Sequence, residues 1–414
     1  MTVHEEISGT PAAAPAAWAT ASQLARALRR REVSSRELLT GYLDRIDRLD
    51  RQLGAVVTLD ADRAYDEAAD ADQAIARGEP LGPLHGLPVP VKDSIEVAGM
   101  RTTAGAPELG SHVPGRDAVA VARLRAGGAI VFGKTNTPTF AADAQTENTV
   151  FGRTSNPWDV SRSPGGSSGG PAAAVAAGLC ALDLGSDLGG SIRMPAGYCG
   201  VYGLRPSAGL VPVRGHIPPR PGDLLAPDLA VIGPLTRGAR DLELVLDAIA
   251  GPDDANAVAW RLRLPPPRAG SLGGYRVAVW LDDPSCPVDD EVLEVLDAAV
   301  QAIRGPGALV DTSVRPADLR ASKRLFQLLV QPQLAHLMTD AQFDDALTAA
   351  GGNCEHPHAR WARMVTQRVR EHTMSAEGAA RLAARWAATF RDWDVLLCPY
   401  ETSRVFLWEA WLAP

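Results

Sequence analysis

The feature that most constrains the fold of this chain is an alternation of amphipathic, helix-like segments with short apolar, strand-like ones. The capping-box pairs Thr20 with Gln23 and Ser34 with Glu37 each precede apolar residues at helical spacing. Further helices are expected over about 61–77, 117–126, 171–178, 288–304, 321–340 and 357–390, and strands over 84–97, 129–134, 275–280, 308–314 and 394–399. Such alternation predicts an α/β fold with a largely buried, central mixed β-sheet flanked by helices.

The organisation of the chain indicates one large domain. Its 414 residues, 46% of them hydrophobic, are enough to bury a sizeable core. We identify no internal repeat and no convincing linker between domains. We therefore expect a flexible lead-in rich in Ala and Pro at residues 1–19 and a single domain over residues 20–414.

Composition excludes several classes of function. The formal net charge of −8 disfavours a nucleic-acid partner and an anionic membrane surface. The sequence has no run of 18 apolar residues, so we expect no membrane span. The amino terminus does not resemble a signal peptide. Five scattered cysteines without CxxC spacing suggest reduced thiols, so we expect a cytoplasmic location. The motif HExxH is absent, which disfavours a zinc hydrolase.

Two Gly/Ser-rich stretches, "SPGGSSGG" (163–170) and "GSDLGGS" (185–191), need an explanation. A flexible linker is disfavoured because ordered-looking apolar segments flank both stretches. A phosphate-binding loop is disfavoured because GxxxxGK[ST] and GxGxxG are both absent. The remaining interpretation is a turn that presents a nucleophilic serine.

The second stretch suits such a serine. A serine that attacks a carbonyl needs a base to take its proton and N–H groups that converge on the developing oxyanion. Gly189 and Gly190 would let the main chain bend and approach a substrate closely. Ser191 would then project from the end of a turn lined by N–H donors.

Lys92 is the candidate base. It ends the apolar run "LPVPVK", and it is one of only three lysines among 41 basic residues. Arginine does not give up its proton, whereas a desolvated lysine amine can become neutral and accept one. The sequence thus predicts a lysine base close to the two Gly/Ser turns.

Five segments in order resemble the amidase signature family, serine hydrolases that cleave carboxamides. These segments are "GLPVPVKDSIEVAGMRTTAG", "GKTNTPTFA", "NPWDVSRSPGGSSGGPAAAVAAG", "GSDLGGSIRMPAGYCGVYGLRPSAG" and "DLAVIGPLTRGARDLELVLDAIAGPD". The resemblance covers about residues 20–250, with its signature core at about 84–250. It implies the single-domain α/β fold of that family.

The resemblance also implies a set of site residues. The family's Ser–cis-Ser–Lys triad corresponds to Ser191 as nucleophile, Ser167 as the serine that follows a cis peptide bond, and Lys92 as base. The oxyanion would be bound by the main-chain N–H groups of Leu188, Gly189, Gly190 and Ser191, with Ser168, Asp187 and Arg193 in supporting roles. No metal or organic cofactor is implied. The partner would be a small-molecule amide of unknown identity, and a homodimer is a family-level expectation.

Two other functions stay open at this point. A glutaminase-type subunit of a tRNA-dependent amidotransferase typically has Gln after the Arg of "SIR", where this chain has Met194. A catalytically impaired or non-catalytic relative is the other, because the chain ends in "YETSRVFLWEAWLAP" instead of the family's usual continuation. The expected fold is therefore shortened at its carboxyl end.

Overall fold

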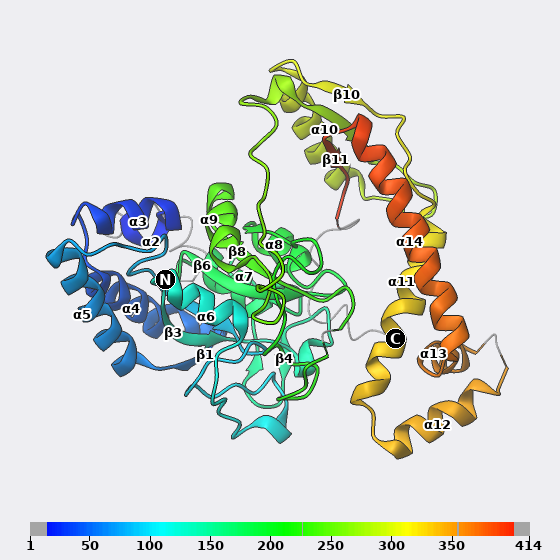
Figure 1. Cartoon of the computed structure of the whole chain (residues 1–414), viewed down its shortest axis with the longest axis horizontal. Coiled ribbons are helices and arrows are strands. Elements are labelled where there is room, and N and C mark those ends of the chain that lie inside the picture. The colour runs from blue at the N-terminus through cyan, green and yellow to red at the C-terminus, as the bar shows by residue number, and fades with distance from the viewer. Residues whose placement is uncertain (1–14, 226, 354–355, 401–414) are drawn as a thin grey trace. The chain divides into compact units, whose positions relative to one another are not determined.

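The structure, a computed structural model, describes residues 15–225, 227–353 and 356–400. The chain forms two compact units, one ending at Leu262 and the other beginning at Arg263 (Figure 1). Sequence reasoning marked no boundary at this point. Each unit has its own sheet and its own helices.

The first unit contains the larger sheet. Its elements are α2 (Pro15–Trp18), α3 (Ala21–Arg29), α4 (Ser35–Leu53), β1 (Val56–Leu59), α5 (Ala61–Arg77), β2 (Pro88–Lys92), η1 (Pro107–Leu109), α6 (Val119–Ala126), β3 (Ile130–Thr135), η2 (Thr139–Ala141), β4 (Glu147–Asn148), β5 (Gly152–Arg153), α7 (Gly169–Ala176), β6 (Leu182–Asp187), α8 (Arg193–Cys199), β7 (Tyr202–Gly203), β8 (Val231–Thr236) and α9 (Ala239–Ile249).

Six strands form a mixed sheet in the order β1-β3-β2-β6-β8-β7. β2 is parallel to β3 and to β6, whereas β1 and β8 are antiparallel to their neighbours. Helices cover both faces of this sheet (Figure 1). The expected α/β class with a central mixed sheet is thus confirmed.

Side-chain alternation along the strands divides the core into two layers. On one face, Val89, Val91 and Leu184 pack with residues of α3, α6 and α9. On the other face, Ile130 and Phe132 pack with residues of α4, α5 and α7. Because successive strand residues point to opposite faces, short apolar strands are sufficient to supply both layers.

Local signals in the sequence set several helix ends. Thr20 with Gln23 and Ser34 with Glu37 form the expected capping boxes at the starts of α3 and α4. α5 covers the expected residues and ends at Gly78, whose φ of 70° is the left-handed conformation that favours glycine. The structure confirms these helix ends. They were predictable because the capping contacts involve only residues close together in the sequence.

The second unit has a three-stranded parallel sheet in the order β10-β9-β11. Its elements are η3 (Leu272–Gly274), β9 (Arg276–Val279), α10 (Asp290–Arg304), β10 (Leu309–Asp311), α11 (Leu319–Leu334), η4 (Ala335–Leu337), α12 (Asp340–Ala350), α13 (Pro357–Val365), α14 (Val369–Asp392) and β11 (Val395–Leu397). A small core around Val277, Val279 and Val300 packs α10 against β9. The strands expected near 275, 308 and 394 are confirmed.

Several sequence expectations need correction. The strand expected over 84–97 is the five-residue β2, and the helix expected over 357–390 is two helices, α13 and α14. β6, β8 and α12 were not predicted as elements. β6 has the sequence LDLGSD, and its two acids and glycine resemble a turn more than a strand. Burial between β2 and β8 overrides that weak local preference.

Both ends of the chain carry expectations that the structure covers only in part. Residues 1–14 of the expected lead-in and the tail after Tyr400, to which the expected shortening refers, lie outside the described residues. Within the lead-in, Trp18 ends α2, and the guanidinium carbons of Arg45 and Arg237 lie 5.1 Å from its ring. Within the described ranges, no helix combines the length and apolar composition needed to cross a bilayer.

Candidate active site

Lys92 is the last residue of β2, an inner strand whose five residues are all buried. Proline has no N–H for a strand ladder and is usually confined to edges or bulges. Pro90 is accommodated because the pairing of β2 with β3 shifts register between Val89 and Pro90. Because β2 lies between β3 and β6, the Lys92 amine at its end is inside the protein.

The Lys92 amine contacts three serine hydroxyls. Its Nζ lies 2.7 Å from the Oγ of Ser167, 3.0 Å from that of Ser168 and 3.0 Å from that of Ser186. The Oγ of Ser168 also donates to the Ser186 carbonyl at 3.2 Å and accepts the Ser186 N–H at 3.3 Å. The amine therefore lies in a cage of groups that can either donate or accept a hydrogen bond.

Burial changes the protonation of Lys92. Its side chain is fully buried, and this desolvation lowers the pKa of the amine to about 7, while the carboxyl groups of Asp187 and Asp183 act in the opposite direction. Asp183 has the weaker charge of the two, because its own burial raises the pKa of its carboxyl well above the usual range. At neutral pH a substantial fraction of Lys92 is uncharged.

The first Gly/Ser stretch is part of the core and not a linker. Every residue from Ser163 to Gly170 is buried, and the Gly166–Ser167 peptide bond is cis, as expected. A Cβ on Gly166 would come within 2.6 Å of the Asp143 carbonyl oxygen, and one on Gly170 within 2.4 Å of the Asn136 main chain. Glycine is required at these two positions because the main chain of the stretch packs directly against other main chain.

Asp187 organises the second stretch. Its carboxylate accepts the N–H groups of Gly190 at 2.9 Å and Ile192 at 3.1 Å, and it accepts two bonds from the Arg193 guanidinium at 3.0 and 2.9 Å. The Nε of Arg205 lies 3.3 Å away. Burial alone would raise the pKa of Asp187, but the Arg193 side chain and the N–H donors hold it below its ordinary value. These contacts fit the bracing role expected of Asp187 and Arg193.

Ser191 lies between this turn and α8 and is half-buried. Its carbonyl accepts the N–H of Ser168 at 3.1 Å, so the main chain joins the two Gly/Ser stretches. The structure thus brings Lys92 and Ser167 into direct contact and ties Ser191 to the residue after Ser167.

The expected oxyanion donors differ in their surroundings. The Gly190 N–H donates to Asp187 and is already used within the protein. Gly189 is exposed, and Leu188 and Ser191 are half-buried. The Gly190 N–H therefore holds the turn in shape.

Sequence reasoning missed two residues near the base. Ser186, the third hydroxyl on the Lys92 amine, was noted only as a residue of the turn. Lys134, on β3, is also fully buried: its Nζ donates to the Ile95 carbonyl and to the Thr102 hydroxyl, and it lies 4.0 Å from Asp93. The scarcity of lysine was the available signal, since Lys323 is exposed and the other two lysines are buried.

His216 is a second candidate for a base, because it is close enough to Lys92 for the charge of the amine to lower its pKa. Burial, followed by the charge of Lys92, lowers the pKa of His216 to about 4. Its Nδ1 lies 2.9 Å from the Pro218 carbonyl oxygen, which can only accept, so Nδ1 carries the proton. Nε2, 3.2 Å from the Ser94 hydroxyl, then accepts. Both nitrogens are used within the protein, which leaves Lys92 as the better candidate for a base.

Comparisons with known proteins identify the family of this chain. A family model described as Amidase matches residues 37–412. A glutamyl-tRNA(Gln) amidotransferase subunit of Heliobacterium modesticaldum is 43% identical over 295 residues, which cover 70% of this chain and 59% of the relative. The chain thus spans about 60% of the length of the curated relatives that it matches.

Solved structures share the fold. A structure of a vestigial protein complex, described in connection with the origins of an s-triazine catabolic enzyme, has a TM-score of 0.79 at 30% identity and covers 94% of this chain and 83% of its own. A bacterial aryl acylamidase of the amidase signature enzymes has a TM-score of 0.79 at 26% identity, covering 94% of this chain and 81% of its own. The family model matches most of the length of this chain, which therefore belongs to the amidase signature family.

Proposed function

We propose that this protein is an amidohydrolase that cleaves a carboxamide C–N bond through an acyl-enzyme on Ser191. The observation that carries the proposal is the fully buried Lys92 amine, 2.7 Å from the Ser167 hydroxyl. The main-chain bond from Ser168 to Ser191 supports it, because this bond holds the nucleophile turn next to the base. Membership of the family supports it as well.

The contacts around the amine support a proton relay. A neutral amine has two N–H donors and one lone pair. The proton of Ser168 is directed at the Ser186 carbonyl, so the Ser168 hydroxyl accepts from Lys92. With the second N–H given to the Ser186 hydroxyl, the lone pair is left for Ser167. Lys92 then takes the proton of Ser167, which takes the proton of Ser191 as Ser191 attacks the amide carbonyl.

The remaining steps use the turn at 187–191. Negative charge on the carbonyl oxygen is stabilised by main-chain N–H groups of the turn at 188–191, of which that of Gly190 also donates to Asp187. The relay returns a proton to the leaving amine, and water hydrolyses the acyl-enzyme by the same path. The mechanism needs no metal or organic cofactor. The small-molecule substrate, the cytoplasmic location and the homodimer remain predictions.

A second candidate function is that of a glutaminase-type amidotransferase subunit. The identity to the glutamyl-tRNA(Gln) amidotransferase subunits of other organisms favours it. Met194, where that group typically has glutamine, favours the free-standing amidase instead. Steady-state rates with glutamine and with simple carboxamides separate the two, and a clear preference for glutamine would support the amidotransferase function.

Covalent labelling tests the proposed nucleophile directly. A small fluorophosphonate is expected to label the wild-type protein at Ser191 and to leave Ser191→Ala unlabelled, as located by peptide mass spectrometry. Ser207→Ala is the matched control, since it removes an exposed hydroxyl that does not contact Lys92. Equal labelling of Ser191→Ala and wild type would overturn the assignment.

A further inference from the structure

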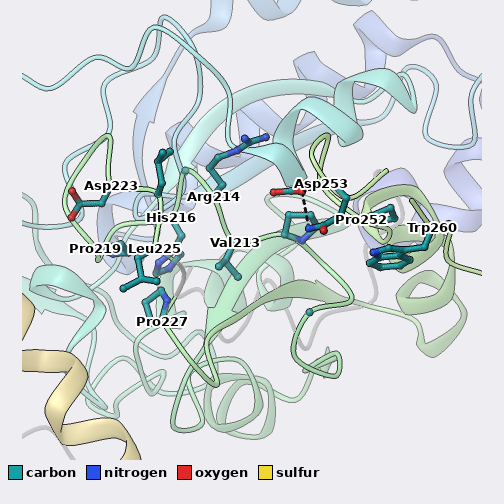
Figure 2. Close-up of a pocket in the computed structure, with 15 residues that line it drawn as sticks. Val213, Arg214, His216, Pro219, Asp223, Leu225, Pro227, Pro252, Asp253 and Trp260 are labelled. Atoms are coloured by element: carbon teal, nitrogen blue, oxygen red, sulfur yellow. Dashed lines mark hydrogen bonds between the residues drawn. The ribbon is translucent and has the colours of Figure 1, made fainter. Parts of the chain in front are cut away.

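A cavity of about 330 Å³ lies in the first unit (Figure 2). Its lining comes from two segments, residues 209–227 and residues 252–260. An apolar cavity of about 150 Å³ is enough to hold benzene, so this cavity has room for a larger ring or an alkyl chain. Its volume falls within the range of small-molecule sites.

The loop that forms most of this cavity is fastened to both strands of the candidate active site. The Ile217 N–H donates to the carbonyl of Ser94, two residues after Lys92, at 2.7 Å. At the other end of the loop, Arg205 pairs with Asp187 and donates to the Leu229 carbonyl at 2.7 Å. The loop is therefore held next to the residues that follow β2 and to the last residue of β6.

The polar groups of the cavity already have partners within the protein. These are His216 with Pro218 and Ser94, Asp223 with the Arg220 N–H at 3.1 Å, Asp253 with the Asn256 amide at 3.1 Å, and Arg214 at 3.5 Å from Asp254. An uncharged, apolar ligand would leave them all in place.

Apolar side chains supply the rest of the lining. Val213, Leu225 and Trp260 come from both segments and appear with the prolines in Figure 2. Leu225 is 80% exposed and Trp260 is 43% exposed. Large apolar side chains that stay exposed around a cavity are typical of a ligand site, because a ligand removes their surface from water.

We propose that this cavity binds the uncharged alkyl or aryl group of the amide substrate and so sets the preference of the enzyme for apolar amides. The inference rests on the proposed amidohydrolase function and adds the substrate class. Leu225 and Trp260 are its specificity-determining residues.

Two matched pairs of amides test the cavity. Hexanamide and acetamide vary the acyl side, whereas N-hexylacetamide and N-methylacetamide vary the amine side. Leu225→Ser and Trp260→Ala are expected to lower kcat/KM for the long member of one pair about tenfold, with little change for its short member. Val258→Ser is the matched control, because Val258 is 91% exposed and lies outside the lining. An equal effect on long and short amides of both pairs would overturn the proposal.

A binding measurement separates failure of the cavity proposal from failure of the catalytic one. Calorimetric titration of Ser191→Ala with hexanamide and with N-hexylacetamide needs no turnover. Weaker binding of one of them after Leu225→Ser or Trp260→Ala supports the cavity even if the wild type hydrolyses no amide. Unchanged binding of both excludes the cavity, whatever Ser191 does.

Discussion

Lys92 and Lys134 are both buried in the same sheet, yet their surroundings differ in kind. Lys92 pairs with Thr135 and Lys134 pairs with Val91 across neighbouring strands, so the two side chains project from opposite faces. Burial lowers the pKa of both amines, to about 7 for Lys92 and to about 8 for Lys134. Desolvation alone therefore does not distinguish them.

The partners of the two amines make the difference. The Ile95 carbonyl can only accept, and the Thr102 hydroxyl gives its own proton to the Met100 carbonyl, so Lys134 donates to both. Asp93 at 4.0 Å favours the charged amine. Lys92 contacts hydroxyls, which can accept a hydrogen bond from the amine or give it a proton. These partners support our proposal that Lys92 is the base and that Lys134 is a structural donor.

Replacing Lys92 is the strongest test of this comparison. Lys92→Met is expected to lower amide hydrolysis about 10²- to 10⁴-fold, because it removes the base. Thermal stability should change little, because removal of the desolvated amine offsets the loss of its hydrogen bonds to the three serine hydroxyls. Measurements of kcat/KM and of the melting temperature check both parts. Turnover close to that of the wild type would reject Lys92 as the base.

Replacing Lys134 should have the reverse effect. Lys134→Met removes the donor from the Ile95 carbonyl and leaves Asp93 without its cation, so the free energy of unfolding should fall by about 3 kcal/mol. Turnover per folded molecule should stay within about tenfold of the wild type. Denaturant titration measures the free energy of unfolding, and active-site titration gives the turnover per folded molecule. A large loss of turnover at unchanged stability would contradict the structural role.

The pH dependence sharpens the same distinction. The lowered pKa of Lys92 means that its amine is charged, and unable to accept a proton, below pH about 7. We expect kcat/KM to be level above that pH and to fall about tenfold per pH unit below it. Lys134→Met should leave the position of this limb unchanged. A profile that is flat from pH 5 to pH 9 would argue against a lysine base with this pKa.

The smallest expected effect concerns the third hydroxyl of the cage. Ser186→Ala leaves one N–H of Lys92 without an acceptor, and we expect kcat to fall about tenfold with KM little changed. Ser186→Thr keeps a hydroxyl at the same position and should restore most of the rate. If threonine and alanine gave the same loss, the hydroxyl would not orient the amine.

The parts of the site that were predictable from sequence were those carried by local pattern. Lys92 was identifiable because the run before it is apolar and because this chain rarely uses lysine. The resemblance predicted the cis bond before Ser167. The capping boxes of α3 and α4 were visible because their contacts span only three residues.

The rest depends on contacts between distant segments. Ser186 reaches Lys92 only because β6 lies beside β2, and β6 was not recognisable as a strand. The bond from Gly190 to Asp187 depends on how the turn closes, so four N–H groups looked equivalent in the sequence. The boundary after Leu262 did have a compositional signal, the Pro/Gly-rich run "PPPRAGSLGG" at 265–274, but such runs also occur in loops inside one domain.

The three lysines differ in exposure, so their rates of chemical modification can show how often the core opens. An amine-reactive acylating reagent should modify Lys323 quickly under native conditions, because its side chain is exposed. Acylation at positions 92 and 134 requires the sheet to open, because both amines are completely enclosed. Modification rates measured by mass spectrometry at these two positions would therefore show how often the sheet opens locally around β2 and β3.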